Sequence, residues 1–337
     1  MNQKTKMLPL SKQHTIFMKP LLYLFLFIAI SSCKTKILPQ VKQYEASLEY
    51  ETKSQLGEGA FWNHKTQELY WVDIEGMQLH IYSPQTKTNR SLEMPSRIGT
   101  VVPSAVNAKA VVALQDGIYN IDVHSGDLEL VSEIERDIPS NRFNDGKCDP
   151  SGRLWVGSMA LDQKQYEANL YMVTENGEAT LKKDSVTISN GIVWTKDKST
   201  MYYIDTPTLE IKAYDYDDAT GAITNERVAV TVNESLGFPD GMTIDANDML
   251  WVALWNGNAV VNYNPKSGKL LSKVEVPAHN VTSCAFGGPN LDVLYITSSS
   301  LDMTEDEKEQ YPFAGSLFKV KLDVKGVKGD FFGSAGK

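Results

Sequence analysis

Cysteine and histidine are scarce in this sequence, which limits the metal chemistry that it can support. The 337 residues include three cysteines, none in a CxxC or a histidine-rich segment. The five histidines show no spacing typical of metal ligands. Structural zinc sites are normally built from cysteine and histidine, so a site of that class is not expected.

An excess of basic residues is also missing. The chain has 33 lysines and arginines against 42 aspartates and glutamates, a formal net charge of −9. Nucleic-acid binding depends on a basic surface that neutralises phosphates, so we expect no nucleic-acid partner. A small neutral molecule or a cation fits this balance better. Apolar residues make up 42% of the chain, enough for a large buried core.

Long apolar runs are absent except near the N-terminus. The run Leu21 to Ile30 is shorter than the ~20 residues of a membrane-spanning helix, and lysines precede it. It ends in Ile-Ser-Ser-Cys at Cys33, an order that resembles a lipobox and implies lipidation of that cysteine. We therefore expect residues 1–33 to be a lipoprotein signal that starts at Met1 or Met18. An uncleaved anchor with an incidental cysteine is the alternative.

The location follows from this signal. Residues 34–43 are polar and contain proline, and we expect them to form a short tether. The protein is then expected in the cell envelope of a bacterium, facing the periplasm. Its only attachment to the membrane would be the lipid on Cys33, and we expect a monomer.

A repeated strand pattern organises the rest of the chain. A short strand rich in aromatic and β-branched residues follows a polar turn six times, at Trp71, Val112, Trp155, Tyr203, Trp251 and Tyr295. The successive spacings of 41, 43, 48, 48 and 44 residues are typical of propeller blades. No long helical periodicity competes with the pattern. The sequence predicts an all-β, six-bladed β-propeller as a single domain over residues 44–337, with a solenoid or a flat sandwich as the alternative.

Ring closure can also be predicted. A late strand at residues 317–322 is expected to pair with the early strand at residues 46–50, because closure protects sheet edges. Cys148 and Cys284 would then lie in the third and sixth blades. That separation exceeds the ~6 Å between Cα atoms that a disulfide allows, so we expect two buried thiols.

Four motifs interrupt the repeat with polar residues that the fold does not require, at residues 56–62, 141–147, 189–191 and 238–242. Each precedes a repeated strand and falls at the start of a blade's inner strand, which lines the central channel. We therefore expect Glu58, Asn144, Asn190 and Asp240 to converge at one end of that channel. Turn formation is the alternative, since Asn-Gly and Asp-Gly pairs commonly form turns. Oxygen donors of this kind suit a hard divalent cation.

The order of these motifs resembles the family of gluconolactonases, senescence marker proteins (regucalcin-like) and luciferin-regenerating enzymes. The likeness extends from about Leu56 to Thr297. It consists of Gly-Glu with Trp62, Arg-Phe-Asn-Asp-Gly-Lys from Arg142, Ser-Asn-Gly from Ser189, Pro-Asp-Gly from Pro239 and Thr-Ser-Cys-Ala-Phe-Gly-Gly from Thr282. The last of these segments contains Cys284 and is interpreted as core packing.

The resemblance implies roles for individual residues. Glu58, Asn190 and Asp240 would bind one divalent metal, with calcium expected and zinc, magnesium or manganese as alternatives. Arg142 and Asn144 would bind a sugar lactone. Two positions depart from the family pattern: Ala60 replaces a proline, and Asp162 stands where some members have a substrate-binding glutamate. A shorter carboxylate at position 162 changes the reach of that group and therefore the preferred sugar.

The expected activity is metal-assisted hydrolysis of a sugar lactone such as gluconolactone. Asp240 is the expected general base. Asp145 is the alternative, because metal coordination lowers the basicity of a ligating carboxylate. No G-x-S-x-G segment is present, so a serine hydrolase is not expected. The remaining alternatives are a calcium-dependent phosphotriesterase-like hydrolase and a non-catalytic propeller that binds a protein or a glycan.

Overall fold

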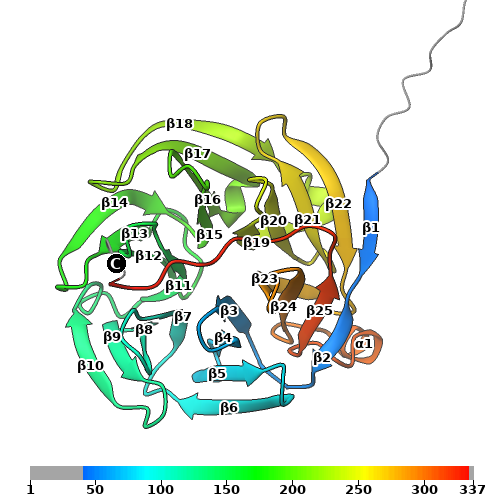
Figure 1. Ribbon diagram of the computed structural model, residues 1–337, viewed down its shortest axis with the longest axis horizontal. Coiled ribbons are helices and arrows are strands. Elements are labelled where there is room, and N and C mark those ends of the chain that lie inside the picture. The colour runs from blue at the N-terminus through cyan, green and yellow to red at the C-terminus, as the bar shows by residue number, and fades with distance from the viewer. Residues whose placement is uncertain (1–40, 334–337) are drawn as a thin grey trace, which may run out of the picture. The chain divides into compact units, whose positions relative to one another are not determined.

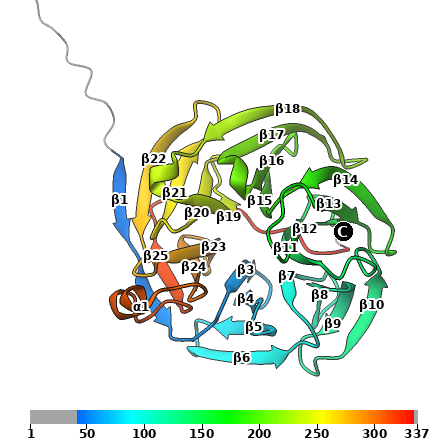
Figure 2. The ribbon, with the colours of Figure 1, turned by 180° about the vertical axis from the view of Figure 1, so that it is seen from behind.

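The computed structural model describes residues 41–333, which form six small sheets arranged in a ring (Figures 1 and 2). The ring confirms the predicted six-bladed β-propeller, and neither a solenoid nor a flat sandwich is present. The predicted signal, Cys33 and the tether up to residue 40 lie outside the described residues. Within residues 41–333, no helix has both the length and the apolar character needed to cross a membrane.

In the first four blades, the strands follow chain order from the channel outward. Blade 1 contains β3 (Gly57–Asn63), β4 (Glu68–Asp73), β5 (Gln78–Ser83) and β6 (Thr88–Glu93). Blade 2 contains β7 (Ile98–Pro103), β8 (Lys109–Leu114), β9 (Gly117–Asp122) and β10 (Leu128–Ser132). Blade 3 contains β11 (Asn141–Cys148), β12 (Leu154–Ala160), β13 (Ala168–Val173) and β14 (Ala179–Val186). Blade 4 contains β15 (Ser189–Trp194), β16 (Thr200–Asp205), β17 (Glu210–Asp217) and β18 (Ala222–Thr231).

The last two blades also take strands from the N-terminal part of the chain. Blade 5 contains β19 (Phe238–Ile244), β20 (Leu250–Trp255), β21 (Ala259–Asn264), β22 (Lys269–Glu275) and β1 (Lys42–Glu45). Blade 6 contains β23 (Asn280–Gly287), β24 (Val293–Ser299), β25 (Leu317–Lys321) and β2 (Ser47–Tyr50). The described helices are short: η1 (Thr206–Thr208), η2 (Glu234–Leu236) and α1 (Glu305–Gln310).

Two N-terminal strands close the ring. The strand β2 pairs with β25 in antiparallel register, with Ser47 opposite Lys319, as the sequence predicts. The strand β1 adds to the outer edge of blade 5 in parallel register with β22, which the sequence does not predict. It begins at Lys42, so the last two residues of the segment predicted as a tether belong to a strand.

The hydrophobic core lies mainly between neighbouring blades. The repeated aromatic residues lie on the second strand of each blade, and Trp71, Trp155, Trp251 and Tyr203 are almost fully buried. One core cluster packs blade 4 against blade 5, and another packs blade 5 against blade 6. Cys148 and Cys284 are buried in two different clusters and form no disulfide, as predicted.

Each inner strand contains an irregularity in its pairing with the second strand of its blade. In β3 the shift falls between Glu58 and Phe61, and Gly59 takes the left-handed conformation, φ 62°. A β-bulge re-aims side chains, and bulges are common beside active sites. The predicted polar motifs therefore lie in bulges of the inner strands, and not in turns.

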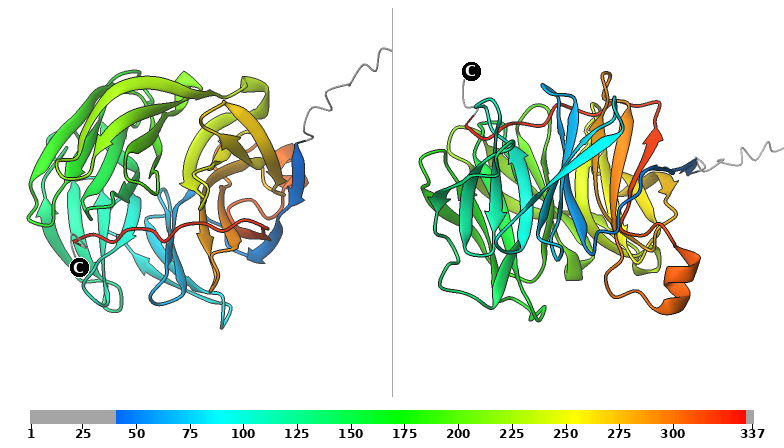
Figure 3. Two further views of the ribbon diagram at one scale, coloured as in Figure 1. Left: turned by 45° about the horizontal axis from the view of Figure 1, so that its top comes forward. Right: turned by 90° about the horizontal axis from the view of Figure 1, so that it is seen from below.

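The C-terminal segment, residues 323–333, crosses one mouth of the channel (Figures 1 and 3). It bridges Gly326 to Asp245 in blade 5 and Phe332 to Ser104 in blade 2. Phe331 and Phe332 are both 3% exposed and pack between blades 2 and 3. The helix α1 lies at the opposite face of the ring (Figure 3). The sequence does not predict this crossing.

Candidate functional site

The predicted site residues come together near the starts of the inner strands. Glu58 lies on β3, Asn144 on β11, Asn190 on β15 and Asp240 on β19. All four side chains are buried, each with 6% or less of its surface exposed. Gly191 allows the strands to approach, because a Cβ there would lie 2.9 Å from the carbonyl oxygen of Asp240. Three consecutive blades and the first blade therefore contribute to one buried polar group.

A continuous chain of hydrogen bonds joins three blades. An Arg142 Nη1 donates to Asn144 Oδ1 at 2.6 Å, and Asn144 Nδ2 donates to Asn190 Oδ1 at 3.1 Å. Asn190 Nδ2 then donates to Thr206 Oγ1 at 2.8 Å. Thr206 Oγ1 donates to the carbonyl oxygen of Pro239 at 2.8 Å, next to Asp240. The chain fixes both amide orientations and leaves one lone pair of Asn190 Oδ1 available.

Three buried carboxylates lie beside this chain. Burial raises the pKa of Glu58 to about 8, and the nearby Asp145 charge adds to the rise. Burial and the Glu58 charge hold the pKa of Asp240 well above its usual range. Burial also raises the pKa of Asp145, whose Oδ1 accepts a bond from Gly146 N at 2.7 Å. Without a cation the site is expected to retain protons at neutral pH.

Arg142 supplies the positive charge of the site. Its side chain is buried, and burial lowers its pKa to about 10, so it stays charged at neutral pH. The charges of Glu75, Glu58 and Asp240 act in the opposite direction on that pKa. Arg142 therefore lies close to the carboxylates, where a guanidinium can bind a substrate oxygen by a charge-assisted bond.

The donor set fits a hard divalent cation. The Glu58 and Asp240 carboxylates are close enough to shift each other's pKa, and two buried carboxylates repel unless a proton or a cation lies between them. The free lone pair of Asn190 Oδ1 would be available as a neutral oxygen ligand. Among residues 41–333, no group of three or more His, Cys, Asp or Glu side chains is arranged to hold an ion. Water or substrate oxygens would have to complete a calcium shell of six to eight ligands.

The structure does not join Asp162 to this group. It lies on the exposed loop between β12 and β13, where its Oδ1 accepts a hydrogen bond from Lys164 N at 3.1 Å. No hydrogen bond links it to Arg142 or Asn144. Its predicted contact with substrate therefore has no support from the geometry of the loop.

Sequence reasoning misses three polar residues of the site. Thr206, in η1, orients Asn190 and contacts the strand that carries Asp240. Arg97 Nε donates to both carboxylate oxygens of Glu75, at 3.0 and 2.9 Å. Both charges of this pair affect the pKa of Arg142, so the pair lies near the mouth of the site. None of the three lies in a recognisable motif, and only the ring brings them to the site.

Glu135 is a further residue that the sequence does not reveal. It is buried in the loop before β11, with φ 58°, a conformation that costs a non-glycine residue free energy. Its Oε1 accepts bonds from Ser158 Oγ at 2.6 Å and Tyr171 OH at 3.1 Å. Its Oε2 accepts from Asn141 Nδ2 at 3.3 Å. Glu135 therefore helps to fix the side chain of Asn141, the residue that directly precedes Arg142.

The ring of blades, the bulged inner strands and the joined polar residues agree with one family. Residues 56–300 match the SMP-30/Gluconolactonase/LRE-like region. The chain belongs to this family. The match includes all four motifs and ends beyond the sixth repeated strand, which confirms the resemblance that the sequence indicates.

Individual relatives show the same likeness. The chain is 42% identical to the putative sugar lactone lactonase YvrE of Bacillus subtilis, covering 84% of this chain and 97% of that protein. It is 37% identical to regucalcin of Danio rerio, over 82% of this chain and 94% of that protein. A crystal structure of regucalcin from Agrobacterium tumefaciens, described as a calcium-binding protein, superimposes with a TM-score of 0.83 at 28% identity, covering 88% and 99%.

Proposed function

We propose that the protein is a calcium-dependent lactonase that opens a sugar lactone such as gluconolactone. The observation that carries this proposal is the hydrogen-bonded chain that starts at Arg142, orients the Asn190 amide and ends at the strand of Asp240. The Asp240 carboxylate in turn interacts with that of Glu58. The lactonase and calcium-binding names of relatives support it. Zinc, magnesium and manganese are the other ions to compare.

Glu58, Asp240 and Asn190 would hold the cation through oxygen atoms. When bound, the cation would polarise the lactone carbonyl and acidify a water molecule. Arg142 would bind a substrate oxygen through its guanidinium, and Asn144 would fix the position of that guanidinium. Arg142 Nη1 donates a hydrogen bond to Asn144 Oδ1 at 2.6 Å, so the group that would orient the lactone is itself held in place.

Asp240 is proposed as the general base. Burial and the Glu58 charge raise its pKa, the direction that increases its tendency to accept a proton from water. Asp145 is the alternative base, because its pKa is also raised and it is not one of the proposed ligands. Replacing Asp145 should therefore leave the proposed calcium ion bound.

Three variants test these roles. Glu58→Gln and Asp240→Asn should each weaken calcium binding by ~10-fold or more and lower gluconolactone hydrolysis with it. Asp145→Asn is the matched control, since it removes a buried carboxylate beside the same site. It should keep calcium binding and most of the activity. If Asp145→Asn abolishes hydrolysis with calcium bound, while Asp240→Asn stays active, the base is Asp145. If all three variants keep full activity, the lactonase site is elsewhere.

We also propose that the protein is anchored to the bacterial cell envelope through lipid on Cys33, on the basis of the lipobox-like Ile30 to Cys33. The variant Cys33→Ser should leave the membrane fraction or accumulate as an unprocessed precursor. Intact mass analysis of the wild type is the direct measurement. A wild-type mass that retains residues 1–32 and lacks lipid would contradict the anchor.

A further inference from the structure

A cavity lies under the C-terminal segment, toward the ends of the inner strands. Its volume is about 230 Å3, and its wall includes Trp62, Trp194 and residues 327–330. Trp62 and Trp194 lie at the C-terminal ends of β3 and β15, whereas Glu58 and Asn190 lie near the starts of the same strands. Engineered protein cavities of ~150 Å3 hold a molecule such as benzene, so this cavity can accept a small organic molecule.

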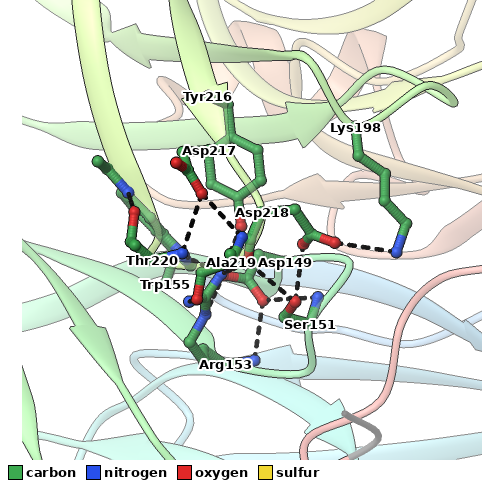
Figure 4. Close-up of polar contacts among 11 residues, drawn as sticks. Asp149, Ser151, Arg153, Trp155, Lys198, Tyr216, Asp217, Asp218, Ala219 and Thr220 are labelled. Carbon is green, nitrogen blue, oxygen red and sulfur yellow. Dashed lines mark hydrogen bonds and ion pairs between the residues drawn. The ribbon is translucent and has the colours of Figure 1, made fainter. Parts of the chain in front are cut away.

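Lysines dominate the charged part of this wall. Lys147, Lys196, Lys198 and Lys328 line the cavity, and Asp330 is the single carboxylate among the lining residues. Lys198 is neutralised by Asp218, with the two charged atoms 3.1 Å apart (Figure 4). The other three lysines form no ion pair within residues 41–333. With four lysines against Asp218 and Asp330, this wall has a local excess of positive charge in a chain whose net charge is −9.

Lys147 is the most enclosed of these cations. It projects from the inner strand β11 and is partly buried, and its Nζ donates to the carbonyl oxygen of Met242 at 2.8 Å. An ammonium group has three N–H donors, so two remain for another partner. The Lys147 charge limits the rise in the pKa of Asp145, but no carboxylate of the described residues forms an ion pair with its Nζ, so a nearby anion would be favoured.

Two indole groups on the same wall also lack an acceptor. Trp62 and Trp194 are 5% and 7% exposed, and neither Nε1 has a hydrogen-bond partner in the described part of the chain. Trp155 Nε1, by contrast, donates to Asp149 at 2.9 Å (Figure 4), and Trp251 Nε1 donates to Asp245 at 3.1 Å. Trp71 Nε1, which does not line the cavity, also has no partner among the described residues. Unsatisfied buried donors beside uncompensated lysines call for an oxygen-bearing ligand.

We propose that this cavity binds a small organic or inorganic anion through its carboxylate or phosphate group. Lys147 and Lys328 would contact the charged oxygens from opposite sides, because one lies on β11 and the other on the C-terminal segment. Phe61, Trp62 and Trp194 line the cavity and would provide apolar surface for the rest of the molecule. This site is separate from the proposed metal site, and none of Glu58, Asn190 and Asp240 lines it.

The test titrates the full protein with gluconate, inorganic phosphate and glucose by isothermal titration calorimetry. Titrations use the Arg142→Ala background, which removes the guanidinium proposed to bind oxygens at the metal site. Gluconate or phosphate should bind with one site per chain, and neutral glucose should not bind. Binding by one anion and not the other identifies the headgroup.

Two variants locate the site. Lys147→Met and Lys328→Ala should each weaken anion binding by at least tenfold, and Lys328→Ala acts on an exposed side chain that folding does not require. Lys325→Ala is the matched control, because Lys325 is exposed on the same segment and does not line the cavity. It should leave binding unchanged. Absence of binding by both anions, or binding unaffected by Lys147→Met and Lys328→Ala, overturns the proposal.

Discussion

The side-chain nitrogen of Asn144 lies 3.1 Å from the side-chain oxygen of Asn190 and donates a hydrogen bond to it. This bond crosses from the third blade to the fourth and joins a proposed substrate residue to a proposed metal ligand. The two functions of the site therefore share one rigid framework. Asn144 bonds directly to the proposed ligand Asn190, whereas Arg142 contacts Asn190 only through Asn144. A substitution at Asn144 should therefore affect metal binding more than one at Arg142.

Substitutions at Asn144 and Arg142 should separate metal binding from substrate binding. Asn144→Ala removes the donor that orients Asn190, so calcium affinity should fall ~10-fold along with kcat/KM, as for other groups that orient metal ligands. Arg142→Ala should lower kcat/KM by ~100-fold, as does the loss of a hydrogen-bond donor to a transition-state oxygen in other enzymes. It should leave calcium affinity unchanged. Calorimetry and steady-state kinetics measure both. Equal loss of calcium affinity in the two variants would contradict the assignment.

Calcium affinity should depend on pH. In the metal-free protein burial raises the pKa of Glu58 to about 8, so calcium must displace a proton at lower pH. Affinity should therefore rise as the pH increases toward 8, because Glu58 then binds calcium without first losing a proton. The same raised pKa makes the metal-free fold less stable as the pH rises through this range. Titrations from pH 6 to 9 test this, and Glu58→Gln should flatten the profile.

Glu135 should act on substrate binding through Asn141 and Arg142. Glu135→Ala removes the acceptor for Asn141, Ser158 and Tyr171, so KM should rise several-fold while calcium affinity stays unchanged. Glu135→Gln keeps one carbonyl acceptor and should restore most of the lost kcat/KM. A purely structural role would instead lower the melting temperature of both variants without a selective change in KM.

The C-terminal segment should contribute strongly to stability. Phe331 is 3% exposed and packs 6.1 Å from the ring of Phe61, so Phe331→Ala should lower the free energy of unfolding by about 3–5 kcal/mol. Phe313 is 39% exposed, so Phe313→Ala is the control. It should change the free energy of unfolding by less than about 0.5 kcal/mol. Urea unfolding measures both. Equal effects would mean that the segment does not hold the blades together.

The sequence predicts the ring because each blade repeats a local pattern of strand and turn. It also predicts which of the inner-strand residues converge, since the motifs occupy equivalent places in different blades. It does not reveal β1, whose pairing with β22 joins residues far apart in the chain. The path of the C-terminal segment and the contacts of Glu135 cannot be predicted for the same reason, because they depend on tertiary contacts. The role of Asp162 stays a prediction, since the structure shows only its bond from Lys164 N on an exposed loop.

The most direct test of the account is hydrolysis of gluconolactone by chelator-treated protein, before and after calcium is restored. The protein stripped of divalent ions should lose at least ~90% of its activity, because Glu58 and Asp240 then retain a proton in place of the cation. Added calcium should restore the rate, with one ion bound per chain. Full hydrolysis by exhaustively chelated protein, with no ion bound, would contradict the proposed metal-dependent lactonase.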